Sequence, residues 1–504
     1  MSYILAYDFG TGGIKASLFD EKGASIASGF DAYATYYPAE GYHEQSPEDW
    51  WRATVKSTRN LIGVLSADQI AKIKAIGISG HSLGVVPIDA SGNLLRSRVP
   101  IWSDSRAGKQ AEEFFERARI TEEAWYCRTG GGFPPGLYSV FKLMWFASHE
   151  KEWFDKVDVI LGTKDYINFK LTGVKATDNS YASGSGVYDL LKREYAKDFI
   201  EASGLKESIF PQIVPSTHIL GTLTKEASEE LGIPQEVQVV AGGVDNSCMA
   251  LGAGAYCEGR AYNSLGSSSW IALSSSRPVI DSKYRPYVFD HVVPGQYASA
   301  LAIFSAGTSH MWLRDVMFDK CENPYAEMDS LAAESSIGAN GLFFNPTLAG
   351  GSSLDLTPKM RGGFANLDLR HTKGDMIRAV MEGVAFGLRN ALDVLRGLVE
   401  VNEPLILVGG GAKAPLWRQI YADVYGMEVA RSGIGQQAAA LGAAVVAGVG
   451  CGVWKSFDVM ESFSDINEIS KPDAKAKEIY QKNYLKYISL TRHLGEWAKE
   501  FENR

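Results

Sequence analysis

A glycine-rich turn near the start of the sequence combines groups that could bind phosphate and a metal ion. It reads Asp8-Phe9-Gly10-Thr11-Gly12-Gly13-Ile14-Lys15 and follows a short apolar run. Glycines let backbone N–H groups approach an anion without an intervening Cβ. Mg²⁺ takes oxygen ligands and keeps much of its water, so Asp8 could hold it directly or through water. The alternative is a plain hairpin turn with a surface aspartate.

A second carboxylate follows an apolar run that is bent by two glycines. The stretch Val239-Val240-Ala241-Gly242-Gly243-Val244 leads directly into Asp245 and Asn246. A carboxylate at such a strand end can accept the proton of a hydroxyl while that oxygen attacks phosphorus. Aspartate after glycine is also typical of a helix N-cap or a turn. The residues alone leave both roles of Asp245 open.

Two further glycine turns could bind other parts of a nucleotide. Gly266-Ser267-Ser268-Ser269 follows a strand predicted over 260–265, and Gly409-Gly410-Gly411-Ala412-Lys413 follows one predicted over 405–408. Successive glycines would let a flat adenine or its ribose lie against the backbone. The alternatives are an ordinary Gly/Ser turn and an ordinary strand-to-helix loop. The sequence has no G-x-x-x-x-G-K-S/T motif, which argues against a Walker-type nucleotide site.

The elements that must position these turns recur in the same order in the two halves of the chain. In the first half, strands are predicted over 3–7, 14–19, 24–28 and 73–79, and the last ends in Gly80-His81-Ser82-Leu83-Gly84. In the second half, strands over 260–265, 270–273 and 405–408 repeat that order. Helices are predicted to begin at two capping boxes, Ser46 with Asp49 and Thr372 with Asp375. The shared order indicates an internal structural duplication.

The chain is long enough for two hydrophobic cores, and we place a domain boundary near Gly252-Ala253-Gly254. We predict one domain over 1–252, a second over 253–470 and a helical tail over 471–504. Aromatic and aliphatic residues recur on one side of this tail, so we expect it to pack against the second domain.

Composition excludes several classes of function. The 504 residues are 45% hydrophobic and 22% charged, as in ordinary globular proteins, and the net charge of −9 gives no electrostatic footprint for nucleic acid or an anionic membrane. No apolar run approaches the roughly 20 residues that span a membrane. The five cysteines form no C-x-x-C pair and the first residues do not resemble a signal peptide. We therefore predict a cytoplasmic protein with reduced thiols.

Taken in order, the motifs resemble those of the FGGY carbohydrate kinases. Ser139-x-x-Lys142-Leu143-x-Trp145-Phe146 looks like the first signature of that family. Phe364-x-x-Leu367 and the stretch from Asp375 to Glu382 look like the second, with Asn366 where glycine is usual. The resemblance extends from Tyr3 to Gly452 and includes all four glycine-containing turns.

The resemblance implies an α/β fold with two actin-like (ribonuclease-H-like) domains and an interdomain cleft for ATP and sugar. The first domain would form the sugar-binding side and the second the ATP-binding side. ATP and Mg²⁺ are the implied cofactors, with Asp8 in the metal–phosphate region and Asp245 as catalytic base. The expected ATP contacts are Thr11, Gly12, Lys15, Gly266, Ser267, Gly307, Gly410, Gly411 and Lys413. The expected sugar contacts are His81, Ser82, Leu83, Gly84, Asp104, Asp245 and Asn246.

Within the family the chain looks most like the xylulokinases, which implies phosphorylation of a ketopentose such as xylulose. In that subgroup the stretch aligned with 80–84 contacts the sugar and usually reads Gly-Gln-Met-His-Gly. Here its middle positions are His81, Ser82 and Leu83. His81 would bond a sugar hydroxyl, or alternatively the backbone at a strand end. Ribulose, fuculose, a tetrulose or gluconate stay open as substrates, as does a non-catalytic sensor of the actin-like ATPase fold. The expected partners are the sugar and ATP, without nucleic acid or membrane, and a homodimer is the assembly to test.

Overall fold

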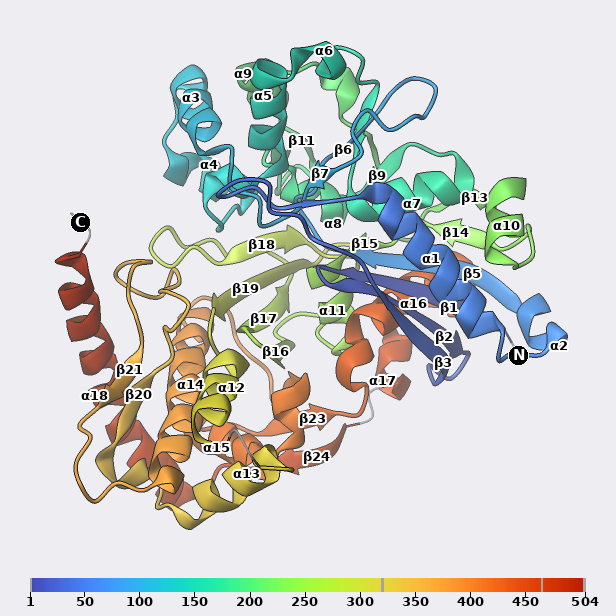
Figure 1. The fold of residues 1–504 in the computed structure, drawn as a ribbon. Helices are drawn as coiled ribbons and strands as arrows, with labels where there is room; N and C mark the ends of the chain where they lie inside the picture. The colour runs from blue at the N-terminus through green and yellow to red at the C-terminus, as the bar shows by residue number, and fades with distance from the viewer. Residues whose placement is uncertain (1, 319–320, 464–465, 502–504) are drawn as a thin grey trace. The chain divides into compact units, whose positions relative to one another are not determined.

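The computed structural model describes residues 2–318, 321–463 and 466–501, and it divides into two compact units (Figure 1). Unit 1 consists of Met1–Glu258, Ser274–Ser299 and Gln437–Phe463. Unit 2 consists of Gly259–Leu273, Ala300–Gln436 and Ser464–Arg504. Each unit combines helices with a mixed sheet, which confirms the predicted α/β class. Both units are assembled from separate stretches, and the predicted continuous domains over 1–252, 253–470 and 471–504 stay a prediction.

The sheet of unit 1 has the strand order β13-β14-β5-β1-β2-β3, and β15 also pairs with β5. The strands β1, β2 and β3 form an antiparallel meander, whereas β14 and β15 run parallel to β5, as does β1. Their bounds are β1 Tyr3–Gly10, β2 Gly13–Asp20, β3 Ser25–Ala32, β5 Ile73–Gly80, β13 Ile219–Thr222, β14 Gln238–Val240 and β15 Gly243–Val244. The carboxyl ends of β1, β5 and β15 therefore meet at one edge.

Helix α1 (Pro47–Ile62) packs against β2 and β3. Ser46 caps it by accepting the Asp49 N–H, whereas the Asp49 carboxylate contacts Arg52 instead of completing the expected box. The Tyr7 hydroxyl bonds Thr58 Oγ1 at 2.5 Å. The apolar side chains of β1 and α1 thus share one buried core.

Helix α16 (Ala438–Gly450) packs against β5, β1 and α11 (Asp245–Gly252), although it lies far away in the sequence (Figure 1). The approach is so close that it requires glycine on both partners. A Cβ added at Gly77 would lie 2.2 Å from the Ala443 carbonyl oxygen, and one at Gly442 would lie 1.9 Å from that of Cys248. Small residues at these positions therefore let α16 cover the sheet.

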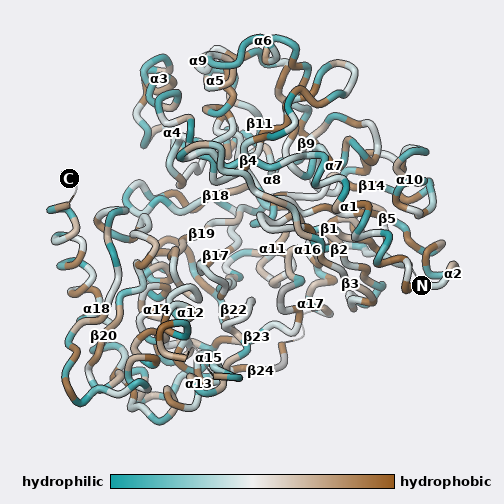
Figure 2. The backbone as a smooth tube through the Cα atoms, viewed as in Figure 1, coloured by the Kyte–Doolittle hydropathy of each residue, from teal (hydrophilic) through white to brown (hydrophobic). Residues whose placement is uncertain are grey.

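A helical layer of unit 1 contains α3 (Gly108–Ala118), α5 (Ser139–His149) and α9 (Lys197–Ser203). Phe114 of α3 packs edge-on against Phe141 of α5 and Phe199 of α9. Figure 2 shows both teal and brown turns along α3, as expected of a helix that buries one side. The remaining short elements of unit 1 include β6 Val86–Ile88, β8 Val159–Leu161, α7 Thr163–Thr172, β9 Ala176–Asp178, α8 Asn179–Ala182 and β12 Gln212–Val214.

In unit 2 the strands are ordered β17-β16-β22-β23-β24. The first two form an antiparallel hairpin, β16 and β22 run parallel, and β22 and β23 run parallel as well. Their bounds are β16 Ala261–Leu265, β17 Ser269–Ser275, β22 Leu405–Val408, β23 Val429–Ser432 and β24 Ile466–Ser470. The hairpin followed by a parallel strand repeats the arrangement of β1, β2 and β5 in unit 1.

The long helix of unit 2 is α14 (Lys373–Arg396), which begins at the capping box predicted from Thr372 and Asp375. Helix α18 (Ala474–Lys499) packs on it, and the Tyr480 hydroxyl donates to Glu382 Oε1 at 2.7 Å. The other unit 2 helices used below are α12 Gly307–Met317, α13 Pro324–Glu334 and α15 Pro415–Tyr425. Within the described part of the chain, no helix has the length and apolar character needed to cross a membrane.

Candidate active site

Three parallel strands of unit 1 bring the two candidate carboxylates to one edge of the sheet. Asp8 of β1 pairs with Ser79 of β5, and Ser79 pairs with Gly243 of β15. His81 directly follows β5, and Asp245 directly follows β15. Ligands of open α/β sheets bind at such carboxyl ends. The register therefore gathers residues that are more than 200 positions apart in the sequence.

Asp8 is held by polar neighbours on both adjoining strands. Ser79 Oγ donates to Asp8 Oδ1 at 2.9 Å, and Lys15 is the pairing partner of Asp8 on β2. Burial raises the Asp8 pKa above its ordinary value, while Ser79 and Lys15 partly counter this effect. The carboxylate thus lies beside a cation in a partly desolvated place, which suits metal and phosphate binding.

The tip of the β1–β2 hairpin is exposed but fixed. Thr11 and Gly12 are both exposed, and a Cβ added at Gly12 would meet no atom within 4 Å. Trp102 Nε1 donates to Thr11 Oγ1 at 2.9 Å, and Gln45 Nε2 donates to the Thr11 carbonyl at 2.7 Å. The turn therefore exposes backbone groups, while these two hydrogen bonds fix its position.

Asp245 is the first residue of α11, and Val244 occupies the N-cap position that the sequence left open for Asp245. Burial and the nearby charge of Asp8 raise the Asp245 pKa to about 7, although the Asn246 N–H, 2.8 Å from Oδ1, lowers it in part. A general base works best when its pKa lies near the working pH. Strongly shifted carboxyl groups at a strand edge are typical of catalytic sites.

The same two carboxylates fit a hydrated divalent cation. The Asp8 charge raises the Asp245 pKa, so a cation between or beside them would relieve the repulsion. Among the described residues no cluster of three or more His, Cys, Asp or Glu could form a complete metal cage. Mg²⁺ is commonly held by one or two carboxylates together with water and substrate phosphates, so the donor set agrees with the predicted ion.

His81 is buried rather than open to solvent. Its Nδ1 atom lies 3.2 Å from Thr163 Oγ1. Its ring contacts the Trp50 ring edge-on, with 5.7 Å between the ring centroids. Burial lowers the His81 pKa to about 4, so the imidazole is neutral at physiological pH and can both donate and accept a hydrogen bond. Thr163 thus takes up one of its bonds, and a sugar contact by His81 stays a prediction.

A buried lysine, Lys142, donates hydrogen bonds that hold the loop after β5. Leu83 has a φ of +60°, an uncommon conformation for a residue with a side chain, and Ser82 and Gly84 flank it. Lys142 Nζ donates to the Leu83 carbonyl at 3.0 Å and to the Ile101 carbonyl at 2.7 Å. Burial lowers the Lys142 pKa to about 7. In the sequence Lys142 stands out only as part of a signature, and nothing there indicates its contact with these two carbonyls.

Asp104 is fully buried and its carboxylate bonds neighbouring protein groups. Arg106 donates to both carboxylate oxygens, at 2.8 and 2.7 Å, and the His43 N–H donates to Oδ2 at 2.8 Å. Arg106 also donates to Glu44 at 2.6 Å. The Arg106 backbone N–H donates to Oδ1 as well, at 3.3 Å, so the predicted sugar contact of Asp104 has to share a carboxylate that already accepts four bonds.

In unit 2 three backbone segments meet at the carboxyl ends of β16 and β22. The Gly307 N–H at the start of α12 donates to the Gly266 carbonyl at 3.0 Å, and the Thr308 N–H donates to that of Ser267 at 3.0 Å. A Cβ at Gly307 would lie 2.5 Å from the Gly266 oxygen, and one at Gly409 would lie 2.6 Å from the Leu265 oxygen. Glycine is thus required where these segments touch.

The same segments leave backbone open to a ligand. A Cβ added at Gly410 would meet no atom within 4 Å. Helix α12 begins beside these segments, and the N–H groups of its first residues, Gly307 and Thr308, are already donated to Gly266 and Ser267. Gly410 to Lys413 form a short 3₁₀ turn whose last carbonyls accept from Arg418. Most of the predicted ATP contacts of unit 2 therefore lie close together.

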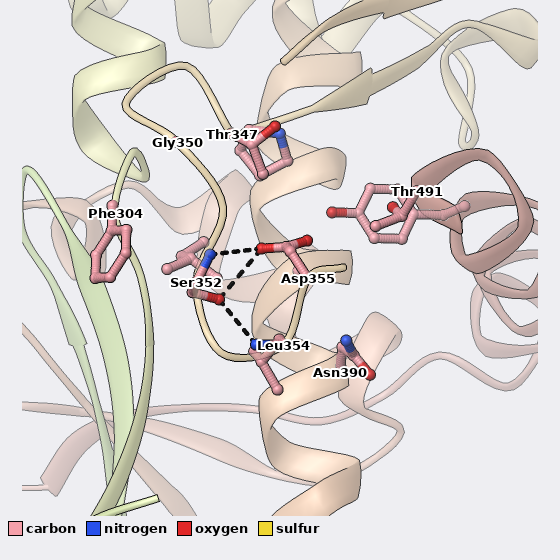
Figure 3. Close-up of a pocket in the computed structure, with 12 residues that line it drawn as sticks. Phe304, Thr347, Gly350, Ser352, Leu354, Asp355, Asn390 and Thr491 are labelled. Atoms are coloured by element: carbon pink, nitrogen blue, oxygen red, sulfur yellow. Dashed lines mark hydrogen bonds between the residues drawn. The ribbon is translucent and has the colours of Figure 1, made fainter. Parts of the chain in front are cut away.

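Each unit contains a pocket formed by described residues. One belongs to unit 2 and lies between α14, α18 and the loop at Ser352, whose N–H and hydroxyl donate to Asp355 at 2.8 and 3.2 Å (Figure 3). None of the predicted site residues lines it. The other belongs to unit 1, where Gly84, Asp165 and Tyr181 help to form its wall.

Family models match nearly the whole chain. The N-terminal domain of the FGGY family of carbohydrate kinases matches residues 3–252, and the C-terminal domain of that family matches residues 261–451. The chain belongs to the FGGY family of carbohydrate kinases. It is therefore a sugar phosphotransferase, as the sequence resemblance predicted.

Individual relatives agree with this membership. A xylulose kinase of Staphylococcus epidermidis is 31% identical over 491 residues, covering 97% of this chain and 96% of the relative. The solved xylulose kinase of Rhodospirillum rubrum superposes with a TM-score of 0.89 at 28% identity, covering 99% and 100% of the chains. A gluconate kinase of Lactobacillus acidophilus shares the fold with a TM-score of 0.89 at 24% identity, covering 99% and 100%. The predicted FGGY fold is thereby confirmed.

One departure from the family signature has a structural explanation. Asn366 stands where the FGGY kinases usually have glycine, and its φ is +64°. Asparagine tolerates this left-handed conformation better than other residues with a side chain. Its Nδ2 also donates to the Gly341 carbonyl at 2.8 Å. The substitution therefore keeps the backbone turn that the glycine would allow.

Proposed function

We propose that this kinase transfers the γ-phosphoryl group of ATP to a hydroxyl of a ketopentose such as xylulose, with Asp245 as general base. The observation that carries the proposal is the position of Asp245 at a sheet edge with a pKa of about 7 beside Asp8. The names of the similar xylulose kinases support the choice of sugar.

Asp245 would accept the proton of the sugar hydroxyl while that oxygen attacks the γ-phosphorus. The Asn246 N–H holds Oδ1, which leaves the other carboxylate oxygen for the proton. Asp8 would hold Mg²⁺ directly or through water, and the ion would supply neutralisation of the phosphate charge. Since little covalent chemistry is required of the protein, positioning and charge stabilisation are its main contributions.

The remaining groups of the site would bind the two substrates. Thr11, Gly12 and Lys15 of unit 1 are proposed to contact the ATP phosphates. In unit 2 the proposed nucleotide contacts are Gly266, Ser267, Gly307, Gly410, Gly411 and Lys413. The proposed sugar contacts are His81, Ser82, Leu83, Gly84, Asp104, Asp245 and Asn246. A neutral His81 can discriminate among hydroxyls because a wrong sugar would leave a buried polar group unpaired.

A related ketose is the second candidate substrate. In the subgroup with the sequence Gly-Gln-Met-His-Gly a histidine occupies the position of Leu83, and Leu83 here is buried and has no side-chain polar group.

We also propose a cytoplasmic location, which the five free thiols support. A homodimer without nucleic acid or membrane partner is the proposed assembly, and light scattering of the purified protein tests it.

The test is sugar-dependent release of ADP from ATP and Mg²⁺, measured as kcat/KM for xylulose, ribulose, fuculose and erythrulose. Xylulose is expected to rank first. Activity on another ketose alone would replace the substrate and keep the kinase chemistry. Negligible activity on every ketose, with a folded protein, would overturn the proposed substrate class.

A further inference from the structure

The backbone just before Asp245 is held by a side chain from another part of unit 1. The N–H of Val244 donates to Ser180 Oγ at 2.9 Å, and Ser180 belongs to the short helix α8. Val244 is fully buried. Its N–H therefore depends on Ser180, because a buried donor without a partner is costly.

Ser180 is in turn held by a buried carboxylate. Its hydroxyl donates to Asp178 Oδ2 at 2.5 Å, so the hydroxyl proton points at Asp178 and a lone pair faces the Val244 N–H. Asp178 Oδ1 accepts from Lys164 Nζ at 2.9 Å. Asp178, Ser180 and Lys164 are all fully buried. A charged, buried chain thus orients a single hydroxyl.

Lys164 connects the same chain to the other side of the bend. Besides Asp178 and Asp165, its ammonium donates to the Ala241 carbonyl at 3.2 Å. Burial alone would lower the Lys164 pKa, but the two carboxylates raise it above its ordinary value, so the ammonium stays charged. One hydrogen-bond network therefore fixes the segment from Ala241 to Val244 at both of its ends.

The segment from Ala241 to Val244 leads directly into Asp245, so its conformation determines the direction of the Asp245 side chain. Gly242 has a φ of +73°, and a Cβ there would lie 2.1 Å from the Ile78 carbonyl oxygen. A Cβ at Gly243 would lie 2.1 Å from Val292. Glycines permit this bend but do not select it, because they have the most conformational freedom of all residues. Side-chain contacts must supply the selection.

We propose that Ser180 is a positioning residue for phosphoryl transfer, which fixes the backbone entering Asp245 through a Lys164–Asp178–Ser180–Val244 chain. The proposal rests on the proposed role of Asp245 as base. It assigns a function to Lys164 of α7, Asp178 of β9 and Ser180 of α8, which are not among the proposed substrate contacts. Small displacements of a catalytic group reduce turnover more than they reduce substrate binding.

Ser216 offers a matched control. Its hydroxyl is also buried and donates to the same oxygen, Asp178 Oδ2, at 2.7 Å. Unlike Ser180, its side chain is not the acceptor of the Val244 N–H. Ser180→Ala and Ser216→Ala thus remove equivalent bonds to Asp178, and only the first also releases Val244.

The experiment measures kcat and both KM values of the full-length parent, Ser180→Ala, Ser216→Ala and Ser180→Thr at one temperature below their unfolding transitions. We expect Ser180→Ala to lower kcat about tenfold with the KM for ATP unchanged, and Ser216→Ala to stay within about twofold of the parent. Ser180→Thr, which keeps the hydroxyl, should restore most of the turnover.

Equal kcat losses in the two alanine variants would overturn the proposal, since the network would then be merely structural. A near-parental kcat in Ser180→Ala would overturn it as well. If Ser180→Ala does not fold, Ser180→Cys replaces it, because a thiol is a weak acceptor, and a kcat loss smaller than that of Ser216→Ala would count against the proposal.

The design separates this proposal from the proposed function. All variants are assayed on whichever sugar the parent phosphorylates best. If the parent prefers another ketose, the substrate changes and the Ser180 comparison still holds. If Asp245→Asn keeps the parental kcat, the base assignment fails, and the Ser180 proposal falls with it.

Discussion

The β1–β2 hairpin of unit 1 and the β16–β17 hairpin of unit 2 have the same backbone arrangement but opposite chemistry. Each is an antiparallel hairpin whose first strand has a parallel neighbour, β5 in unit 1 and β22 in unit 2. The first hairpin carries Asp8 paired with Lys15, whereas the second carries only glycine and serine at its turn. The same backbone arrangement therefore carries charged side chains in unit 1, whereas in unit 2 its turn offers mainly backbone groups to a ligand.

The contrast extends to the next strand of each unit. After β5 and β15 come His81 and Asp245, whose pKa values are strongly shifted, to about 4 and about 7. After β22 come three glycines, and the first ionisable group, Lys413, lies five residues beyond the strand. Substitutions in unit 1 should therefore change turnover and its pH dependence, and those in unit 2 should change nucleotide affinity.

The largest expected effect is that of Asp245→Asn. Loss of the base should lower kcat by about 10²–10⁴-fold, while sugar binding persists in part. Steady-state kinetics and sugar binding by calorimetry measure the two quantities. Asp31→Asn on β3 is the control, because Asp31 pairs with Lys56 and does not shift the Asp245 pKa. A folded Asp245→Asn enzyme with near-parental kcat would remove Asp245 from the mechanism.

A pH profile tests the coupling of the two carboxylates. The base must be deprotonated, so kcat/KM, which reports the free enzyme, should fall about tenfold per pH unit below the Asp245 pKa of about 7. Asp8→Asn should lower kcat and move this acid limb to lower pH, because the Asp8 charge helps to raise the Asp245 pKa. An acid limb that does not move in the residual activity would contradict the coupling.

Two adjacent glycines of unit 2 should respond differently to alanine. Gly410→Ala adds a Cβ into open space, so stability should persist while the KM for ATP rises about tenfold. Gly409 has φ +98° and ψ −177°, a conformation almost confined to glycine, and Gly409→Ala should lower the free energy of unfolding by about 1–3 kcal/mol. Thermal unfolding and ATP titration distinguish the two. A normal KM in Gly410→Ala would mean that ATP does not approach this backbone.

The last expected effect concerns the pH dependence of stability. The folded-state pKa of Asp245 is raised from 3.8 to about 7, so folding disfavours its charged form, and this cost appears as the pH rises through that window. Asp245→Asn removes the cost above pH 7 and changes little below pH 4. The variant should therefore unfold at a higher temperature than the parent at pH 8 and at a similar temperature at pH 4. Equal shifts at both pH values would point to packing instead of charge.

Local sequence patterns were sufficient for the hairpins but not for the contacts between distant segments. Apolar runs and glycine turns predicted β1, β2, β5, β16 and β22 close to their observed bounds. The spacing also marked Asp245, since glycines before an aspartate are a local signal. The family resemblance, not the spacing, linked Asp245 to Asp8, because only the strand register brings them to one edge.

The residues that sequence reasoning missed are those whose role depends on a partner elsewhere. Ser180 is an ordinary serine in the sequence, and its importance comes from Val244, 64 positions away. Lys142 is buried against carbonyls of two loops, which no periodicity reveals. Asp104 illustrates the reverse, because Arg106 lies only two residues away and an Asp-x-Arg pair could have suggested their ion pair.

The close packing of α16 has a consequence for how a cell makes this protein. A ribosome completes β1, β5 and α11 long before it synthesises residues 438–450, because most of unit 2 is encoded in between. Until α16 emerges, the strand face around Gly77 lacks the helix that later covers it. A nascent chain halted after residue 436 would thus present an apolar strip to chaperones and proteases, and completion of the first unit must wait until translation is almost finished.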